Sequence, residues 1–275
     1  MFKIQLKDTV LDLSTPLVMG ILNATPDSFF EGSRMQQIDA GVKKAIEMAQ
    51  FGAGILDIGG QSTRPGAELI TEAMEIDRVV PMIEAIHAAI PNMPISIDTY
   101  HATVAKAAID AGASIVNDIS CGNFDSKMIS TVVSNQVAYI GMHQTGGPST
   151  MHEVQDRNDV IKTIMDYFFE KKKQFDAIGL TQWIIDPGFG FSKTKTENFE
   201  LVKSLAQLKE LNLPILLGVS RKSSIYKTLG VDASEALNGT TVLNTIGLMG
   251  GANILRVHDV REAKEAIIIV NEMNA

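Results

Sequence analysis

The feature that most constrains the fold is a repeated alternation of short apolar runs with longer amphipathic stretches. Each apolar run has the length of a β-strand and ends in polar residues; the runs span 17–23, 55–60, 95–99, 115–120, 137–143, 183–187, 215–220 and 253–259. Helical periodicity occupies stretches between them, such as 38–51, 72–90, 102–111, 160–179 and 199–211. Eight strands alternating with helices predict a single (β/α)₈ barrel domain over residues 1–275. An open doubly wound sheet is the alternative, because a sequence does not show whether a sheet closes.

Local signals support this division. Gly52, Gly112 and Gly251 each stand at the end of a predicted helix and are each followed by alanine and the start of a strand. Glycine commonly ends helices because it adopts the left-handed conformation without strain. Before the first barrel strand, residues 2–6 alternate apolar and polar, and residues 10–13 form a second short segment. This pattern predicts an N-terminal β-hairpin.

Composition excludes several classes of partner. The net charge is −8, whereas general nucleic-acid or membrane-surface binding needs a basic footprint. No apolar run approaches the length of a bilayer span. The single cysteine, Cys121, rules out an internal disulfide and suits a reducing compartment. We therefore expect a cytoplasmic protein that acts on small molecules, without a nucleic-acid or membrane partner.

Polar residues stand at the carboxyl ends of most predicted strands. Because side chains alternate along a strand, each of these residues shares a face with the residue two positions earlier, and most of these earlier residues are apolar. The strand-end polar residues are Asn23, Asp98, Asn117, Asp186, Ser220, Arg256 and His258. One such aspartate is best explained as a helix cap. Six strands that end in this way predict a site at the barrel mouth, where the carboxyl ends converge.

The residue types at the strand ends suggest two groups. The carboxylates and amide of Asp98, Asn117 and Asp186 suit a flat heterocycle that carries several N–H donors and a carbonyl. Lys222 and Arg256 are cations that balance these carboxylates or hold a ring oxygen.

The second group suits an anion and a hard metal ion, and comprises Asn23, Thr63, Arg64, Arg256 and His258. Arginine binds phosphate well, and Mg²⁺ takes few protein ligands when phosphate oxygens and waters complete its coordination.

Other polar and soft residues are given simpler interpretations. The lysines at 171–173 lie on a helical segment and read as a solvated face. Cys121 reads as an inert thiol. Met142 lies on the inward side of its strand, where it would pack against a flat ring. Arg221 is expected to point outward or to form an ion pair, although it adjoins Lys222.

The motifs at these strand ends resemble the dihydropteroate synthase family of pterin-binding enzymes. The matching stretches are residues 19–29, 57–66, 97–100, 117–120, 186–191, 218–223 and 256–259, with one motif per strand and in one order. The resemblance implies a (β/α)₈ barrel that forms a homodimer. It also implies a transferase that joins 6-hydroxymethyl-7,8-dihydropterin pyrophosphate to p-aminobenzoate with Mg²⁺, so that pyrophosphate leaves before the arylamine attacks.

The resemblance also assigns residues by position. The implied catalytic residues are Asp98, Asp186, Lys222 and Arg256. The implied pterin set is Asp98, Asn117, Asp186 and Lys222, lined by Met142, Phe191 and Gly218. The implied pyrophosphate and magnesium group is Asn23, Thr63, Arg64, Arg256 and His258, with Asn23 as the metal ligand. The implied p-aminobenzoate pocket is Lys222 and Ser223 with Phe29, Thr63 and Pro65. The family's two flexible loops correspond to residues 24–33 and 61–69.

Three positions depart from the family pattern. Gln61 stands where glutamate is common, Glu31 stands where aspartate is expected, and the residues after His143 lack an arginine. None of the three belongs to the pterin set. Two alternative functions remain open: a methyltetrahydrofolate-dependent methyltransferase, which shares the pterin-binding barrel, and a catalytically silent pterin-binding paralogue.

Overall fold

Eight parallel strands form the centre of the computed structural model, which describes residues 2–7, 9–24, 31–61, 68–155 and 157–273. Each strand is rich in β-branched and aliphatic residues, as expected for strands that are buried on both faces. The strands are β3 (Leu17–Asn23), β4 (Ala53–Gly59), β5 (Ile95–Asp98), β6 (Ile115–Asp118), β7 (Ala138–Met142), β8 (Ile184–Asp186), β9 (Leu216–Leu217) and β10 (Ile254–Val257). All eight lie within the predicted runs or within two residues of them.

The order of these strands closes the sheet into a barrel. β3 pairs in parallel with both β4 and β10, so the first and last barrel strands are neighbours. The remaining seam lies between β8 and the segment before β9, where Ile185 bridges Ile215 and its amide donates to the Pro214 carbonyl at 2.9 Å. Closure confirms the (β/α)₈ barrel and excludes the open doubly wound sheet.

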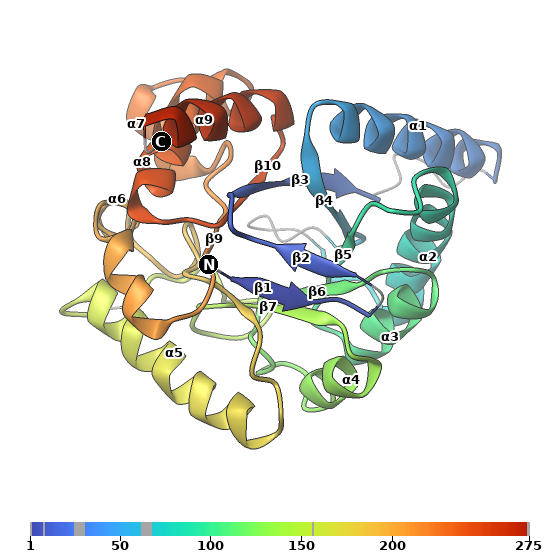
Figure 1. The fold of residues 1–275 in the computed structure, drawn as a ribbon, viewed down its shortest axis with the longest axis horizontal. Helices are drawn as coiled ribbons and strands as arrows, with labels where there is room; N and C mark the ends of the chain where they lie inside the picture. The colour runs from blue at the N-terminus through green and yellow to red at the C-terminus, as the bar shows by residue number, and fades with distance from the viewer. Residues whose placement is uncertain (1, 8, 25–30, 62–67, 156, 274–275) are drawn as a thin grey trace.

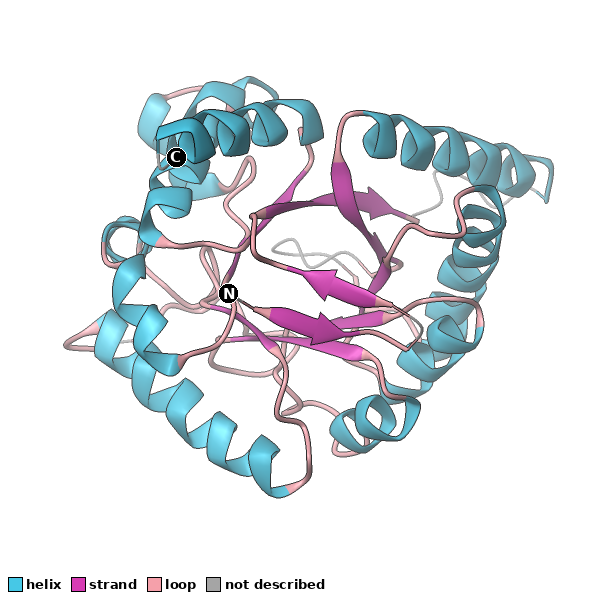
Figure 2. Cartoon of the chain, in the orientation of Figure 1, coloured by secondary structure: helices cyan, strands magenta, loops and turns pink. Residues whose placement is uncertain are grey.

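Helices surround the barrel, as Figure 2 shows. They are α1 (Glu31–Gln50), α2 (Glu72–Ala89), α3 (Ala102–Asp110), α4 (Met128–Asn135), α5 (Val160–Ala177), α6 (Lys195–Lys203), α7 (Ser223–Leu229), α8 (Leu237–Gly250) and α9 (Val260–Met273), with 3₁₀ turns η1 (Leu205–Leu211) and η2 (Ala233–Glu235).

Two helix boundaries differ from the prediction. α1 begins at residue 31, inside the segment predicted as the loop 24–33. The helix predicted over 199–211 is two elements, because a capping box of Thr194 and Glu197 starts α6 earlier and a 3₁₀ turn follows it. The glycine boundaries are confirmed: Gly52, Gly112 and Gly251 have φ of 96°, 120° and 102°.

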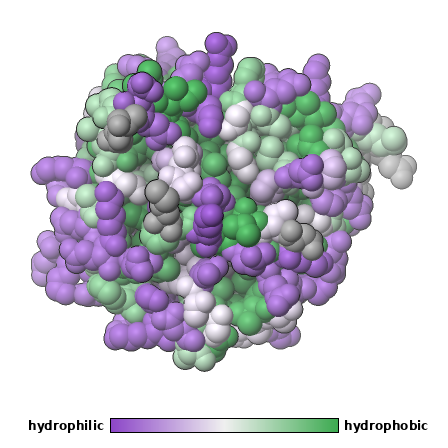
Figure 3. Space-filling view, in the orientation of Figure 1, coloured by the Kyte–Doolittle hydropathy of each residue, from purple (hydrophilic) through white to green (hydrophobic). Residues whose placement is uncertain are grey.

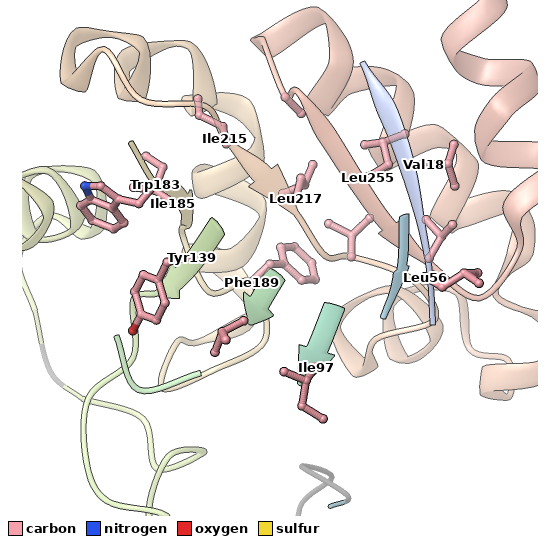
Figure 4. Packing of buried hydrophobic residues seen from close by; sticks show 14 of the residues in the cluster. Val18, Leu56, Ile97, Tyr139, Trp183, Ile185, Phe189, Ile215, Leu217 and Leu255 are labelled. Atoms are coloured by element: carbon pink, nitrogen blue, oxygen red, sulfur yellow. The ribbon is translucent and has the colours of Figure 1, made fainter. Parts of the chain in front are cut away.

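The outward faces of the strands and the inner faces of the helices form the larger core. Figure 4 shows part of it, with Tyr139, Trp183 and Ile185 near one another on one side of the barrel and Val18, Leu56 and Leu255 on the other. This core holds the helices against the barrel by burial of apolar surface.

A second, separate core fills the half of the barrel interior that is nearer the amino-terminal ends of the strands, which is called the lower half. Its barrel members are Met19, Ile55, Ile115, Ala138, Ile140, Ile184, Leu216 and Ile254. The predicted hairpin is present as β1 (Lys3–Gln5) and β2 (Val10–Asp12), which pair antiparallel. It lies across the amino-terminal end of the barrel (Figure 1) and adds Ile4, Leu6, Leu11 and Leu13 to the same core. The hairpin therefore closes the bottom of the barrel.

The surface is mixed in character. Hydrophilic side chains cover most of the periphery of the hairpin face (Figure 3). Among the described residues, no helix is both long enough and apolar enough to span a membrane.

The prediction for residues 171–173 was wrong at one position. The Lys171 side chain is buried, and its Nζ donates to the Cys121 carbonyl at 2.8 Å and to Asn123 Oδ1 at 2.6 Å. Lys171 therefore fixes the turn after β6 instead of facing solvent. Burial raises the pKa of the Cys121 thiol to about 12, which agrees with an inert thiol.

Candidate active site

The upper half of the barrel interior is polar, in contrast to its lower half. Above the apolar layer, seven of the eight strands present a group that can bind a ligand or leave space for one. These residues are Asp57 on β4, Asp98 on β5, Asn117 on β6, Met142 on β7, Asp186 on β8, Gly218 after β9 and Arg256 on β10. The alternation of side chains thus builds a ring of functional groups at the barrel mouth.

Arg256 joins two of the carboxylates. Its Nε donates to Asp57 Oδ2 and its Nη2 donates to Asp98 Oδ2, both at 2.6 Å. Burial lowers the pKa of Arg256, but the Asp57 and Asp98 carboxylates outweigh that effect and raise it. Burial raises the pKa of Asp98 to about 7, while Arg256 opposes the rise and Asp57 adds to it.

Asp57 is a site residue that the sequence analysis missed. It is completely buried, and its Oδ2 also accepts from Asn117 Nδ2 at 3.0 Å. Its Oδ1 has no hydrogen-bond partner among the described residues. A buried acceptor without a partner indicates a place for a donor that a ligand or water brings. Alternation from Ile55 would have placed Asp57 at the mouth.

A second charged pair lies next to this cluster, where a Cβ at Gly218 would lie 3.9 Å from Arg256 Cβ. The Asp186 Oδ1 accepts from the Gly188 amide at 2.7 Å, and burial raises the pKa of this carboxyl while Lys222 lowers it. Burial lowers the pKa of Lys222 to about 8, and Asp186 opposes that change. A Cβ at Gly218 would lie 3.8 Å from Asp186 Oδ2 and 3.9 Å from Lys222 Nζ. Glycine therefore leaves open space directly beside this pair.

Apolar and aromatic side chains complete one wall. Phe191 and Met142 are buried in the same cluster, and the Phe191 ring centroid lies 4.7 Å from Lys222 Nζ. His152 stacks on Phe191 with ring centroids 5.0 Å apart and an interplanar angle of 22°. This wall suits a flat ring. From the sequence, His152 is expected at a surface or helix position, because it lies in an irregular segment without periodicity; the structure instead stacks it on this wall.

The structure describes only some of the residues that are predicted to bind an anion. Asn23 ends β3 with an exposed side chain, and Ser223 is exposed at the first position of α7. His258 follows β10, and its Nδ1 lies 3.0 Å from Ser220 Oγ. Thr63 and Arg64 lie outside the described residues, as do Phe29 and Pro65. Arg256 lies in the carboxylate cluster, so it links this group to the ring group.

Arg221 is ion-paired, as predicted. Its Nε and Nη2 donate to the two carboxylate oxygens of Asp259 at 2.9 and 2.8 Å, and its Nη1 donates to the carbonyls of Ala233 and Ser234. The guanidinium thus ties the loop after β9 to the start of α9 and to η2.

A metal ion would find few protein ligands here. The described residues contain no group of three or more His, Cys, Asp or Glu side chains that could hold one. The Asn23 amide oxygen is compatible with Mg²⁺ bound mainly by phosphate oxygens and water, which is the usual arrangement for this ion.

The start of the second predicted loop is held by Gln61. Its Oε1 accepts from the Ile70 amide at 2.9 Å, and its Nε2 donates to the Glu68 carbonyl at 3.0 Å. The amide group therefore uses both its acceptor and its donor across the loop, which a glutamate could not do.

The fold and the site define a (β/α)₈-barrel enzyme whose functional groups converge at the carboxyl ends of the strands. A family model described as pterin binding enzyme matches residues 19–258. The chain is 40% identical over 270 residues to dihydropteroate synthase of Escherichia coli, covering 98% of this chain and 95% of that protein.

Solved structures agree. A Yersinia pestis dihydropteroate synthase in complex with a sulfonamide drug has a TM-score of 0.92 and 36% identity, and the match covers 99% of both chains. A Xanthomonas albilineans dihydropteroate synthase with 4-aminobenzoic acid has a TM-score of 0.91 and 33% identity over 99% of this chain and 98% of that one. The chain belongs to the pterin-binding enzyme family.

Proposed function

We propose that this protein is a dihydropteroate synthase, a transferase that joins 6-hydroxymethyl-7,8-dihydropterin pyrophosphate to p-aminobenzoate and releases pyrophosphate. The observation that carries the proposal is the barrel mouth, where Asp57, Asp98, Asn117 and Asp186 surround the open space beside Gly218. Carboxylates and an amide complement the N–H groups and carbonyl of a pterin ring. The similarity to dihydropteroate synthases over nearly the whole chain supports the same conclusion.

The reaction breaks the bond between the pterin methylene carbon and the pyrophosphate oxygen, and forms a bond from that carbon to the arylamine nitrogen. The amine proton leaves to pyrophosphate or solvent. If pyrophosphate departs first, positive charge develops on the pterin, and Asp98 and Asp186 stabilise it because they are held close to the ring. Lys222 and Phe191 hold the ring edge and face. An arylamine that attacks a cation needs no strong base.

The leaving group needs positive charge. Arg256 and Arg64, with Thr63 and His258, supply cations and donors for the pyrophosphate. Mg²⁺, held through Asn23 and phosphate oxygens, would neutralise charge on the leaving group. Ser223 at the start of α7 and Lys222 would contribute to the p-aminobenzoate pocket.

The proposed assembly is a homodimer. On α8, Val242, Ile246 and Met249 are 50%, 41% and 62% exposed and recur at helical spacing, so they form one apolar ridge. Ile269 of α9 is 62% exposed and lies beside the same helix. A second copy would cover this ridge. Met249→Glu should give a monomer in sedimentation at micromolar concentration, whereas Ile178→Glu, an exposed apolar position on α5's end, should leave the dimer intact.

The proposed compartment is the cytoplasm, supported by the single buried cysteine. Its test is the fractionation of cells that express the protein.

The reaction assay tests the function directly. Incubation with dihydropterin pyrophosphate, p-aminobenzoate and Mg²⁺ should yield dihydropteroate and pyrophosphate, and a chelator should reduce the rate. Lys222→Ala should raise the KM for the pterin by roughly 30-fold or more, because it leaves Asp186 buried without its cation. Lys227→Ala, an exposed position on the same helix, is the matched control.

Each alternative has its own outcome. Methyl transfer from methyltetrahydrofolate without dihydropteroate formation would identify a methyltransferase. Pterin binding without either reaction would identify a silent paralogue.

A further inference from the structure

Lys193 is a buried lysine that the proposed chemistry does not use. It lies in the β8–α6 loop, residues 187–194, and is 6% exposed. Its Nζ lies 2.9 Å from the Gly188 carbonyl, 3.2 Å from the Phe191 carbonyl and 3.1 Å from His143 Nδ1. The lysine therefore ties two points of its own loop to the end of β7.

These three acceptors match the three protons of an ammonium group, and the His143 carbonyl oxygen is a longer contact at 3.5 Å. The match requires a neutral His143 whose Nδ1 accepts. His143 is 1% exposed, and burial lowers its pKa well below the usual value, with Lys193 and Arg157 acting in the same direction. The protonated lysine is thus fully satisfied in this pocket.

The other side of the same loop contacts the pterin site. Lys222 Nζ donates to the Phe189 carbonyl at 2.5 Å and lies over the Phe191 ring. The Gly188 amide donates to Asp186. Residues 188–191 therefore lie between two lysines. Lys193 donates to the carbonyls of Gly188 and Phe191, and Lys222 donates to the Phe189 carbonyl.

The loop needs such an anchor because its backbone is unusual. Gly188 and Gly190 have φ of 72° and 85°, and Ser192 has φ of 49°. A Cβ at Gly188 would lie 1.9 Å from the His143 carbonyl oxygen. Arg157 Nη2 adds a hydrogen bond to the Ser192 carbonyl at 2.7 Å. Left-handed residues in series are not set by local propensity, so side chains must fix this path.

Stability alone does not explain a lysine at this position. No carboxylate among the described residues forms an ion pair with Lys193. Burial lowers its pKa to about 7; Arg157 and Lys222 act in the same direction, and Asp186 and Glu197 oppose them. A buried charge without an ionic partner reduces stability.

We propose that Lys193 is a positioning residue for the pterin site: by holding the Gly188 and Phe191 carbonyls, it fixes the loop that presents Phe191 and the Phe189 carbonyl to Lys222. The inference rests on the proposed function, because it takes the pterin as the ligand of this wall.

The main test is Lys193→Met, which keeps the apolar stem and removes the ammonium group. Loss of charged hydrogen bonds should raise the KM for dihydropterin pyrophosphate by roughly tenfold or more, with a much smaller change in the KM for p-aminobenzoate. Lys195→Met is the matched control, because Lys195 is exposed two residues further on. Lys193→Arg, which keeps the charge, should restore part of the pterin affinity.

The pH dependence separates this role from general packing. In wild type, Lys193 loses one of its three donated protons as pH rises through about 7. The ratio of the variant's pterin KM to that of wild type should therefore fall as pH rises from 6 to 8.5. Titration of Asp98 occurs in both proteins and cancels in this ratio.

The melting temperatures of wild type and Lys193→Met as a function of pH give a second measurement, which separates a charged role of Lys193 from a purely structural one. The folded pKa of Lys193 lies below the ordinary lysine value of 10.5, so wild type gains stability relative to Lys193→Met as pH rises between about 7 and 10. The melting temperature of wild type minus that of the variant should therefore increase over this pH interval.

An equal pterin KM in Lys193→Met and wild type at every pH would overturn the proposal. Equal losses for both substrates together with a melting-temperature difference that does not change with pH would overturn it as well. If wild type forms no dihydropteroate, the proposed function fails. Calorimetric titration with the pterin would then still compare wild type and Lys193→Met, and unchanged affinity would reject the positioning role separately.

Discussion

The lower and upper halves of the barrel interior are built by the same strands two residues apart, yet they differ completely in chemistry. The lower half is an apolar layer that includes Ile55, Ile184 and Ile254, sealed by the hairpin. The upper half replaces these with Asp57, Asp186 and Arg256. One strand thus contributes to stability at one end and to ligand binding at the other.

The difference shows where the fold accommodates the free-energy cost of burying charged groups. Buried charges require desolvation, and a mutual ion pair compensates for it only in part. The lower layer, the hairpin and the large outer core supply the apolar burial that lets the mouth keep three acids and two cations buried or half-buried. Substitutions at the two levels should therefore separate activity from stability.

The largest effect is expected from Arg256→Leu. It leaves Asp57 and Asp98 without their shared cation, and truncating one member of a buried charged pair costs about 2–5 kcal/mol. We expect a loss of kcat/KM of roughly 30-fold to several thousand-fold, by the usual factor of ten per about 1.4 kcal/mol. Steady-state kinetics on folded protein, checked by circular dichroism, measure this. Near-normal turnover would remove Arg256 from the reaction.

Ile55→Ala tests the lower layer on the strand that carries Asp57. Removing a fully buried isoleucine should lower the free energy of unfolding by about 2–5 kcal/mol. Below the unfolding transition, kcat/KM per folded molecule should stay near the wild-type value. Urea unfolding and kinetics on the same samples give both numbers, and a selective loss of activity would show that the two layers are not independent.

Gly218→Ala is the reverse case. The added Cβ meets only ordinary contacts, 3.8 Å from Asp186 Oδ2 and 3.9 Å from Lys222 Nζ, so stability should change by less than about 0.5 kcal/mol. The methyl group occupies space that the ring needs, so the KM for the pterin should rise. Thermal melts and pterin titrations distinguish the two effects. Unchanged pterin affinity would mean that the ring does not lie over Gly218.

The pH dependence of Asp98 distinguishes the layers without altering shape. Its folded pKa is raised to about 7 from an ordinary value of 3.8, so the folded state binds this proton more tightly. Stability from this group is present at low pH and is lost as pH rises from about 4 to 7. The unfolding free energy of wild type relative to Asp98→Asn should fall over that interval. An increase would mean that the pair with Arg256 keeps Asp98 ionised.

The smallest effect is expected from Gln61→Glu, which lies at the rim. The carboxylate can still accept from the Ile70 amide, but it cannot donate to the Glu68 carbonyl. Loss of one exposed hydrogen bond should cost about 1 kcal/mol or less. Chemical denaturation measures it. A loss of activity comparable to that of Arg256→Leu would place the rim within the functional mouth.

Much of the barrel was predictable because strands that are buried on both faces appear in the sequence as continuous apolar runs. The strand-end residues Asp98, Asn117 and Asp186 were predictable because each stands at the carboxyl end of an apolar run, and alternation places Asn117 and Asp186 above Ile115 and Ile184 in the apolar layer. Asp57 also follows an apolar residue, Ile55, by two positions. It was missed because it lies inside the predicted apolar run and not at the polar end of that run. Closure of the sheet needed the structure, since pairing of β3 with β10 joins distant parts of the chain.

The loop contributions could not be predicted in the same way. Lys193 and His152 reach the site wall through irregular segments with no periodicity, and the path of the β8–α6 loop depends on several left-handed residues. The burial of Lys171 is a similar case, because its partners are backbone and amide oxygens that a helical pattern does not reveal.

The pairing of Arg256 with Asp57 also sets an order of events during synthesis. The two residues are 199 positions apart, and β10 is the last strand to leave the ribosome. At roughly 5–20 residues per second, Arg256 is synthesised on the order of 10–40 seconds after Asp57. A partly made chain therefore holds uncompensated acids at the place where its barrel is still open. The docking of one strand closes the sheet and neutralises the mouth in the same step, so that a nascent chain acquires its complete site only when it acquires its complete fold.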